Sequence, residues 1–212
     1  MTTIIESYAG KTVLGIGAHP DDLEIAMGGT LARLSRAGAK VVMTAVAIPD
    51  KLAERKSEGV RAARILGASF ETLEPERCVR VEDLAMHDLV GRIDRLVRKY
   101  EPEALFSHSS HEIHFDHVLT HRAVLSSTRL RPMDVYLFGP STCKPSLQGF
   151  QPRIWVDITD TVDAKIDAIA AHESQFAQRG ICVGLFRDQA RSRGLPLKID
   201  FAEGLDIYCL RG

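Results

Sequence analysis

Short apolar runs alternate with longer amphipathic stretches along most of this 212-residue chain, and this alternation limits its fold more than any other feature. The apolar runs predict strands at residues 12–17, 41–48, 69–73, 104–109, 134–138, 153–159 and 205–210. The amphipathic stretches predict helices at residues 23–38, 51–67, 84–100, 116–130 and 161–175, with a weaker helix before the last strand. Such alternation is typical of a mostly parallel sheet with helices on both faces. We therefore predict a Rossmann-like three-layer α/β sandwich.

The bulk properties of the chain limit its size class and its partners. Its length suits one domain, and we expect residues 1–212 to form it. Lys plus Arg total 27 and Asp plus Glu total 28, so no basic field is present to hold a nucleic acid. No apolar run could cross a bilayer and no signal-peptide pattern is present, which predicts a cytoplasmic protein without membrane insertion. The sequence leaves the oligomeric state open and is compatible with a homo-oligomer.

The four cysteines show no pattern of paired function. Cys78, Cys143, Cys182 and Cys209 are far apart in the sequence and form no CxxC pair. We therefore expect reduced, mostly buried thiols, as is usual in a cytoplasmic protein.

Two polar clusters follow strands that the topology should make neighbours. The sequence AHPDD (18–22) directly follows the strand at 12–17, and HSSHEIHFDH (108–117) directly follows the strand at 104–109. If the strand order begins 3-2-1-4, these strands lie side by side where the winding direction reverses. Ligands bind at such a reversal, beyond the carboxyl ends of the strands. The two clusters should therefore face each other across one site.

The second cluster is rich in the side chain that most often binds metals. Five of the eight histidines lie within fourteen residues: His108, His111, His114, His117 and His121. Catalytic zinc typically has three protein ligands and a water. His19 and Asp22 could supply two of them, and one histidine from 114–121 the third. In isolation, HPDD could instead be a turn with a helix N-cap, and the histidines a solvated loop.

A nucleotide cofactor is a poorer interpretation of the same residues. GIGAHP (15–20) begins like a dinucleotide fingerprint, but Pro20 stands at the third glycine position. The chain also has no Walker A sequence. We therefore reject the nucleotide site.

At this point the motifs resemble a known family. AHPDD, GGTLARL in the following helix and HFDH after the fourth strand resemble the PIG-L/LmbE-like family of metal-dependent N-acetylglucosaminyl deacetylases. The resemblance continues in RKSEGVRAARILGA, in VDITDTVDAKIDAIAAHESQ and in FAEGL, in the family's order. It implies an LmbE-like fold and a hydrolase that removes an acetyl group from an N-acetylated small molecule.

The resemblance also implies a metal site. The expected ligands of one divalent ion are His19, Asp22 and His117. Zinc is the expected metal, with iron or another divalent ion as alternatives. His121, four residues after His117, competes for the third ligand position, because both can lie on one helix face.

The same resemblance assigns the catalytic roles. Asp21 matches the general base, which takes a proton from the attacking water. His114 matches the histidine that stabilises the oxyanion and helps to protonate the leaving amine. Asp116 matches the carboxylate that orients His114, and a bonded carboxylate should favour the charged form of that ring. Asp21 and Asp22 would thus be adjacent because one binds the metal and the other uses it.

Several further residues have a structural alternative beside the functional one. Arg55 corresponds to an arginine that approaches the substrate in the family, but it could equally be an exposed helix arginine paired with Glu54 or Glu58. His108 and His111 could line the entrance, although a solvated loop is the simpler interpretation. We expect His87 on a helix surface and His172 in helix packing or capping.

The substrate beyond its acetyl group stays open. Many relatives carry Gly-Glu after the second strand, where this chain has IPDK (48–51), and many have a glutamate after the fifth strand, where it has YLFGPS (136–141). We expect an N-acetylated amino sugar of the N-acetylglucosamine type or a conjugate of it. The alternatives are an amidase or esterase acting on a non-sugar substrate and a non-catalytic metal-binding regulatory protein. Asp21 and His114 argue against the last, because a binding site needs neither a base nor an oxyanion partner.

Overall fold

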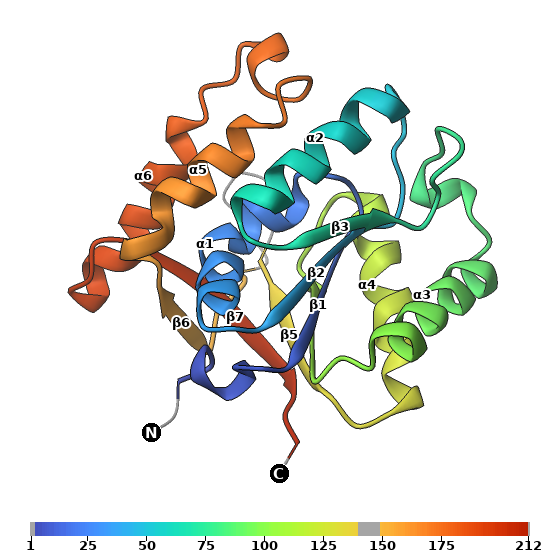
Figure 1. Ribbon diagram of the computed structural model, residues 1–212, viewed down its shortest axis with the longest axis horizontal. Helices are drawn as coiled ribbons and strands as arrows, with labels where there is room; N and C mark the ends of the chain where they lie inside the picture. Colours follow the sequence, from blue (N-terminus) through green and yellow to red (C-terminus); the bar gives the residue numbers. More distant parts are fainter. Residues whose placement is uncertain (1–2, 140–148, 212) are drawn as a thin grey trace.

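A twisted seven-stranded sheet forms the centre of the molecule (Figure 1). The computed structural model describes residues 3–139 and 149–211. The strand order is β3-β2-β1-β4-β5-β7-β6. The strands are β1 (Thr12–Gly17), β2 (Lys40–Ala45), β3 (Ser69–Thr72), β4 (Ala104–His108), β5 (Asp134–Phe138), β6 (Ile154–Asp157) and β7 (Ala202–Cys209). The order confirms the predicted start 3-2-1-4.

The sheet is parallel over most of its width. β1 pairs in parallel with both β2 and β4, and the neighbours β3 and β5 continue the same direction. β7 alone runs antiparallel, between β5 and β6. The winding therefore reverses between β1 and β4, and the carboxyl ends of these two strands lie side by side. The predicted α/β class with a mostly parallel sheet is confirmed.

Helices cover both faces of the sheet and create the three layers. They are α1 (Asp22–Arg36), α2 (Leu52–Ile65), α3 (Met86–Tyr100), α4 (Phe115–Ser127), α5 (Val162–Ala170) and α6 (Gly184–Gly194). Val13 of β1 packs into the core beneath α1, α2 and α5, whereas the next residue, Leu14, packs into the core beneath α3 and α4. Each central strand therefore buries both of its faces, which explains why β2 reads as a continuous apolar run.

Helix α1 has a break, and a buried carboxylate accepts hydrogen bonds from the backbone N–H groups that the break leaves unpaired. Met27 has φ −147° and ψ 25°, so the helix restarts after it and leaves backbone N–H groups without helical acceptors. Glu203 of β7 accepts the N–H groups of Gly29 and Thr30 at 3.0 and 2.7 Å. Lys165 of α5 donates to Glu203 at 2.5 Å and to the carbonyl of Ile25 at 2.6 Å. Glu203 belongs to the FAEGL motif, and its position gives that motif a structural purpose.

The structure corrects one prediction and confirms another. Cys78, Cys182 and Cys209 are free but exposed, so the expectation of mostly buried thiols was wrong for them; Cys143 lies outside the described residues. His87 lies on the surface of α3, as predicted. Across residues 3–139 and 149–211, no helix combines the length and the apolar character needed to cross a membrane.

Candidate active site

The AHPDD sequence makes a tight turn from β1 into α1, and a strained residue lies at its centre. Asp21 is the N-cap of α1 and has φ 111°, a region that side-chain-bearing residues rarely adopt. The carboxylate of Asp22 accepts the backbone N–H of His19 at 2.8 Å, which closes the turn. A Cβ at Gly17 would lie 2.9 Å from the Cβ of Asp22, so the strand must end in glycine here. Backbone strain of this kind clusters at functional sites.

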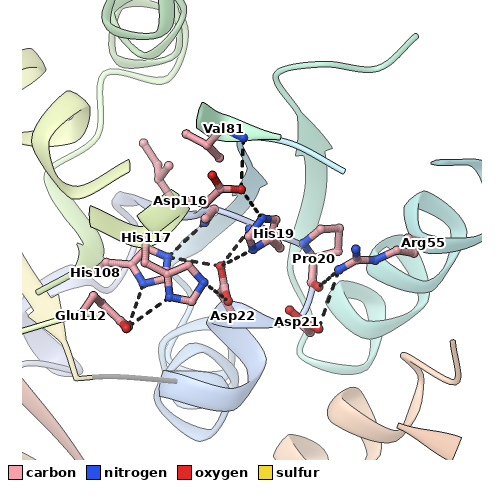
Figure 2. Close-up of polar contacts among 12 residues, drawn as sticks. His19, Pro20, Asp21, Asp22, Arg55, Val81, His108, Glu112, Asp116 and His117 are labelled. Atoms are coloured by element: carbon pink, nitrogen blue, oxygen red, sulfur yellow. Dashed lines mark hydrogen bonds and ion pairs between the residues drawn. The ribbon is translucent and has the colours of Figure 1, made fainter. Parts of the chain in front are cut away.

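Three predicted metal ligands converge where the two clusters meet (Figure 2). One potential ligand atom from each of His19, Asp22 and His117 lies within 4.8 Å of the others. His117 Nε2 is 3.3 Å from one oxygen of Asp22, and His19 Nδ1 is 3.9 Å from the other. Asp22 and His117 are buried. Two imidazoles and a carboxylate on one side of a pocket are a donor set that fits catalytic zinc.

His121 has a different neighbour. Its Nδ1 donates to the backbone carbonyl of His108 at 2.7 Å, and it belongs to neither of the two groups of potential ligands found among the described residues. Within the candidate range 114–121, His117 is therefore the histidine that the fold brings to His19 and Asp22.

Asp116 has another partner than the one predicted for it. Its carboxylate accepts a hydrogen bond from His19 Nε2 at 2.9 Å and is held by the N–H groups of Val81 and Glu82 at 3.1 and 3.0 Å. Burial acts to raise the pKa of Asp116, but the bonds from His19 and Val81 prevail and lower it. The expected bond to His114 is not formed, so the prediction that Asp116 orients His114 was wrong. Asp116 orients the His19 ring instead, so that the Nδ1 atom of His19 faces Asp22.

His114 lies directly before α4, is exposed and lines the pocket together with His19 and His117. Its ring stacks on His117 with centroids 4.5 Å apart and meets the edge of His19 at 5.3 Å. Partial burial and the neighbouring His117 and His19 lower its pKa, whereas Asp116 acts weakly in the opposite direction. Asp116 thus acts on this pKa in the expected direction, but the two side chains are not hydrogen-bonded, so burial and the neighbouring histidines outweigh it.

Asp21 and Arg55 lie next to the ligand group. The Arg55 guanidinium is buried, 3.9 Å from Asp21, and bonds Asp50 at 3.2 Å and the Pro20 carbonyl at 3.4 Å (Figure 2). The alternative of an exposed helix arginine was therefore wrong. Burial and repulsion from Asp22 raise the pKa of Asp21 to about 6. A carboxylate with a pKa near the working pH is suited to general base catalysis.

His108 and Glu112 belong to the same buried cluster, although sequence reasoning gave Glu112 no role. His108 is fully buried and its Nδ1 lies 3.3 Å from Glu112, so the solvated-loop interpretation was wrong for this histidine. Glu112 also lies 3.3 Å from His117 Nδ1. Burial acts to raise the pKa of Glu112, but the bonds from the two histidines lower it to about 2. The only sequence signal was a carboxylate inside the histidine-rich segment.

The two remaining histidines of this region, His172 and His111, do not belong to the ligand group. His172 is buried and bonds Glu24 of α1 at 2.9 Å, which confirms the packing role predicted for this histidine. His111 is half-buried, with its ring 6.1 Å from that of Phe150.

A pocket of about 870 Å³ opens above the ligand group. Its polar lining comes from His19, Asp21, Asp22, Asp50, Arg55, Arg80, His114, Asp116, His117, Gln175 and Arg179. Its apolar lining comes from Ile25, Pro49, Ile113, Phe176, Ile181, Leu185 and Phe186. The pocket thus combines apolar walls with a small number of polar groups, as small-molecule sites commonly do.

Comparisons with known proteins agree with this geometry. The family model described as PIG-L, GlcNAc-PI de-N-acetylase, matches residues 14–128, which include both polar clusters. An uncharacterized deacetylase from Escherichia coli K12, YaiS, is 27% identical over 174 residues, covering 77% of this chain and 91% of that protein.

Solved structures share the fold over nearly the whole chain. N,N'-diacetylchitobiose deacetylase from Pyrococcus horikoshii has a TM-score of 0.76 at 24% identity, covering 93% of this chain and 83% of that one. GalB from Pseudomonas putida KT2440, a 4-carboxy-2-hydroxymuconate hydratase, has a TM-score of 0.79 at 23% identity, covering 95% and 98%. At these identities the likeness shows the fold alone, and two enzymes of different reaction classes share it.

Proposed function

The chain belongs to the PIG-L family, and from this premise we propose that it is a metal-dependent hydrolase that removes the acetyl group from an N-acetylated amino sugar or a conjugate of one. One observation carries the proposal. Asp21, a carboxylate outside the group formed by His19, Asp22 and His117, stands beside that group with its pKa raised to about 6. A site that only bound a metal would have no use for such a base.

The proposed metal ligands are His19, Asp22 and His117. Their buried atoms and the open pocket above them fit a three-ligand catalytic site, and zinc is the proposed ion, with iron or another divalent ion as alternatives. When bound, such an ion lowers the pKa of water from 15.7 to about 7 and polarises a carbonyl group.

The side chains around this group divide the remaining work. Above a pH of about 6, Asp21 is ionised and can accept the proton of the attacking water. Once protonated, it can return that proton to the amine nitrogen as the C–N bond breaks. His114, with its lowered pKa, keeps one ring N–H at neutral pH and can donate it to the developing oxyanion. Asp116, placed by Val81 and Glu82, holds His19 in orientation.

Substrate binding is assigned to the pocket above these residues. Arg55 reaches Asp21 from the floor of the pocket, where its guanidinium can contact the substrate's polar groups. The names of the Escherichia coli and Pyrococcus horikoshii proteins support deacetylation, and the second supports a sugar. The volume of the pocket and its apolar lining leave room for a substituent beyond the sugar ring. We also propose that residues 1–212 form a single cytoplasmic domain.

Acetate release from zinc-reconstituted protein tests the proposal. The panel should include N-acetylglucosamine, its alkyl and aryl glycosides, N,N'-diacetylchitobiose, a non-sugar acetamide and an acetate ester. We expect acetate from at least one amino sugar, and less by about 10²-fold or more from the Asp21→Asn variant. Turnover confined to the non-sugar amide or ester would overturn the sugar assignment. Stoichiometric metal with no turnover of any N-acetylated sugar or acetamide would favour the regulatory alternative.

A further inference from the structure

Glu112 lies beside two stacked histidines, and one of its oxygens faces the Nδ1 atom of each ring. Its Oε1 is 3.3 Å from His108 Nδ1 and 3.3 Å from His117 Nδ1. The two imidazole rings stack with centroids 4.2 Å apart and planes inclined by 22°. Glu112 is itself buried, on the segment between β4 and α4. A buried carboxylate shared by two parallel rings can fix both of them at once.

The opposite edges of the same rings meet Asp22. His117 Nε2 lies 3.3 Å from Asp22 Oδ1, and His108 Nε2 lies 3.2 Å from Asp22 Oδ2. The four side chains therefore form a closed cycle of contacts in which two carboxylates alternate with two imidazoles (Figure 2). Within this cycle, Asp22 and His117 belong to the ligand group that includes His19, whereas His108 and Glu112 do not.

The chemistry of the carboxylate fixes where the ring protons lie. An ionised carboxylate only accepts hydrogen bonds, so a hydrogen bond to Glu112 from either Nδ1 requires a proton on that nitrogen. A histidine that keeps its proton on Nδ1 offers the lone pair of Nε2 to a metal. We propose that Glu112 is a positioning residue that holds the proton on His117 Nδ1 and thereby aims His117 Nε2 at the metal site. This inference rests on the metal site of the proposed function.

The arrangement repeats the one at His19. There Asp116 accepts from His19 Nε2 at 2.9 Å and leaves Nδ1 toward Asp22. Each histidine of the ligand group thus has its own carboxylate on the far side of the ring. Such outer partners set the tautomer and raise the basicity of a ligating imidazole.

A second metal ion is the competing interpretation of the same cluster. His108, Glu112 and His117 also place potential ligand atoms within 4.8 Å of one another. That group would use His117 Nδ1, whereas the group with His19 uses Nε2, and a neutral imidazole cannot bind ions through both nitrogens. His108 Nε2 accepts the backbone N–H of Ala18 at 3.1 Å. A neutral His108 therefore carries its proton on Nδ1, and this protonated nitrogen could not bind a second ion. Hydrogen bonding by Glu112 therefore accounts for the cluster without a second ion.

Zinc affinity of the Glu112→Gln variant tests the proposal. Competition with a chromophoric chelator should show affinity lowered by about 10–100-fold relative to wild type, because a neutral amide is a weaker acceptor. Glu74→Gln is the matched control. Glu74 is a buried glutamate paired with Arg77 and Arg92 and lies outside the pocket lining, so this variant should lose stability but keep zinc affinity.

Histidine ring ¹⁵N spectra of the zinc-loaded wild type supply a second readout that needs no variant to fold. We expect the ring of His117 to retain its proton on Nδ1. Wild-type zinc affinity in Glu112→Gln, or a His117 proton on Nε2, would overturn the assignment. Two zinc ions in the wild type and one in Glu112→Gln would also overturn it, because Glu112 would then be a ligand. Wild-type protein that binds neither zinc nor another divalent ion would instead refute the proposed function.

Discussion

Asp21→Asn should lower activity and raise stability at the same time. Asparagine keeps the shape of the side chain but cannot take a proton, so turnover should fall by about 10²-fold or more, the usual contribution of a general base. Asn tolerates positive φ better than most residues, so the 111° backbone of Asp21 should persist. Metal content should stay unchanged, because Asp21 does not belong to the group of His19, Asp22 and His117.

The gain in stability follows from the raised pKa of Asp21. Its folded-state pKa of about 6 exceeds the ordinary value of 3.8, so the folded state holds the proton more tightly than the unfolded state. The stabilisation by that proton is complete below pH 3.8 and is lost as the pH rises through 6. A shift of about two units corresponds to at most about 3 kcal/mol. Removing the charge should raise the Tm of metal-free protein at pH 8 by up to about 6–12 °C.

Thermal unfolding of chelator-treated protein at pH 8 and pH 4 measures this effect. Asp21→Asn should exceed the wild type at pH 8, and the difference should shrink at pH 4, where Asp21 is protonated in the folded protein. Asp88→Asn, whose side chain is 61% exposed, is the control and should change little. A less stable Asp21→Asn protein at pH 8, or an equal gain at both pH values, would refute the reasoning. Full activity would remove Asp21 from the mechanism.

Three further predictions concern the ligands and the scaffold that holds them. His117→Ala should lose stoichiometric metal by elemental analysis while His121→Ala keeps it, and the reverse result would show that the third ligand is His121. Asp116→Asn should lower zinc affinity by about 10–100-fold, measured by chelator competition, because His19 loses its partner; an unchanged affinity would contradict that role. Glu203→Gln should lower the free energy of unfolding by about 3–5 kcal/mol, because Lys165 would keep a buried charge with no carboxylate to pair it. Adding Lys165→Met should recover much of that loss in denaturant unfolding, and a double variant as unstable as the single one would contradict the pairing.

Sequence reasoning located the site because its position follows from the order of the strands and helices along the chain. Hydrophobic periodicity identifies the strands, and the reversal of winding places the ends of β1 and β4 side by side whatever their side chains are. The sequences AHPDD and HFDH lie at those two ends, so His19, Asp22 and one histidine from 114–121 could be brought together without coordinates. The choice of His117 among these histidines came from the family resemblance. The antiparallel placement of β7 between β5 and β6 carries no such local signal.

Sequence reasoning did not find the partners of the site residues, because these depend on side-chain direction. Asp116 lies two residues after His114, yet it points to His19 and to the N–H groups of Val81 and Glu82, which arrive from the segment before α3. Helix residues two apart do not face each other, so proximity in sequence was misleading here. Arg55 was equally ambiguous, because its partners come from two places: Asp50 from the loop before α2 and Pro20 from the turn between β1 and α1.

The density of histidines in HSSHEIHFDH follows from the way the site is built. A ligating imidazole needs one nitrogen for the metal and a fixed acceptor for the other, and for His117, a proposed ligand, this segment supplies the acceptor in Glu112. His114 lies outside that pairing and faces the pocket, which leaves its ring N–H available for a substrate. His108 fills the position behind His117, and His121 anchors the backbone of His108. A hydratase and a deacetylase share this fold, so the backbone alone does not choose the reaction. We propose that the choice rests with two groups that line the pocket, Asp21 and His114.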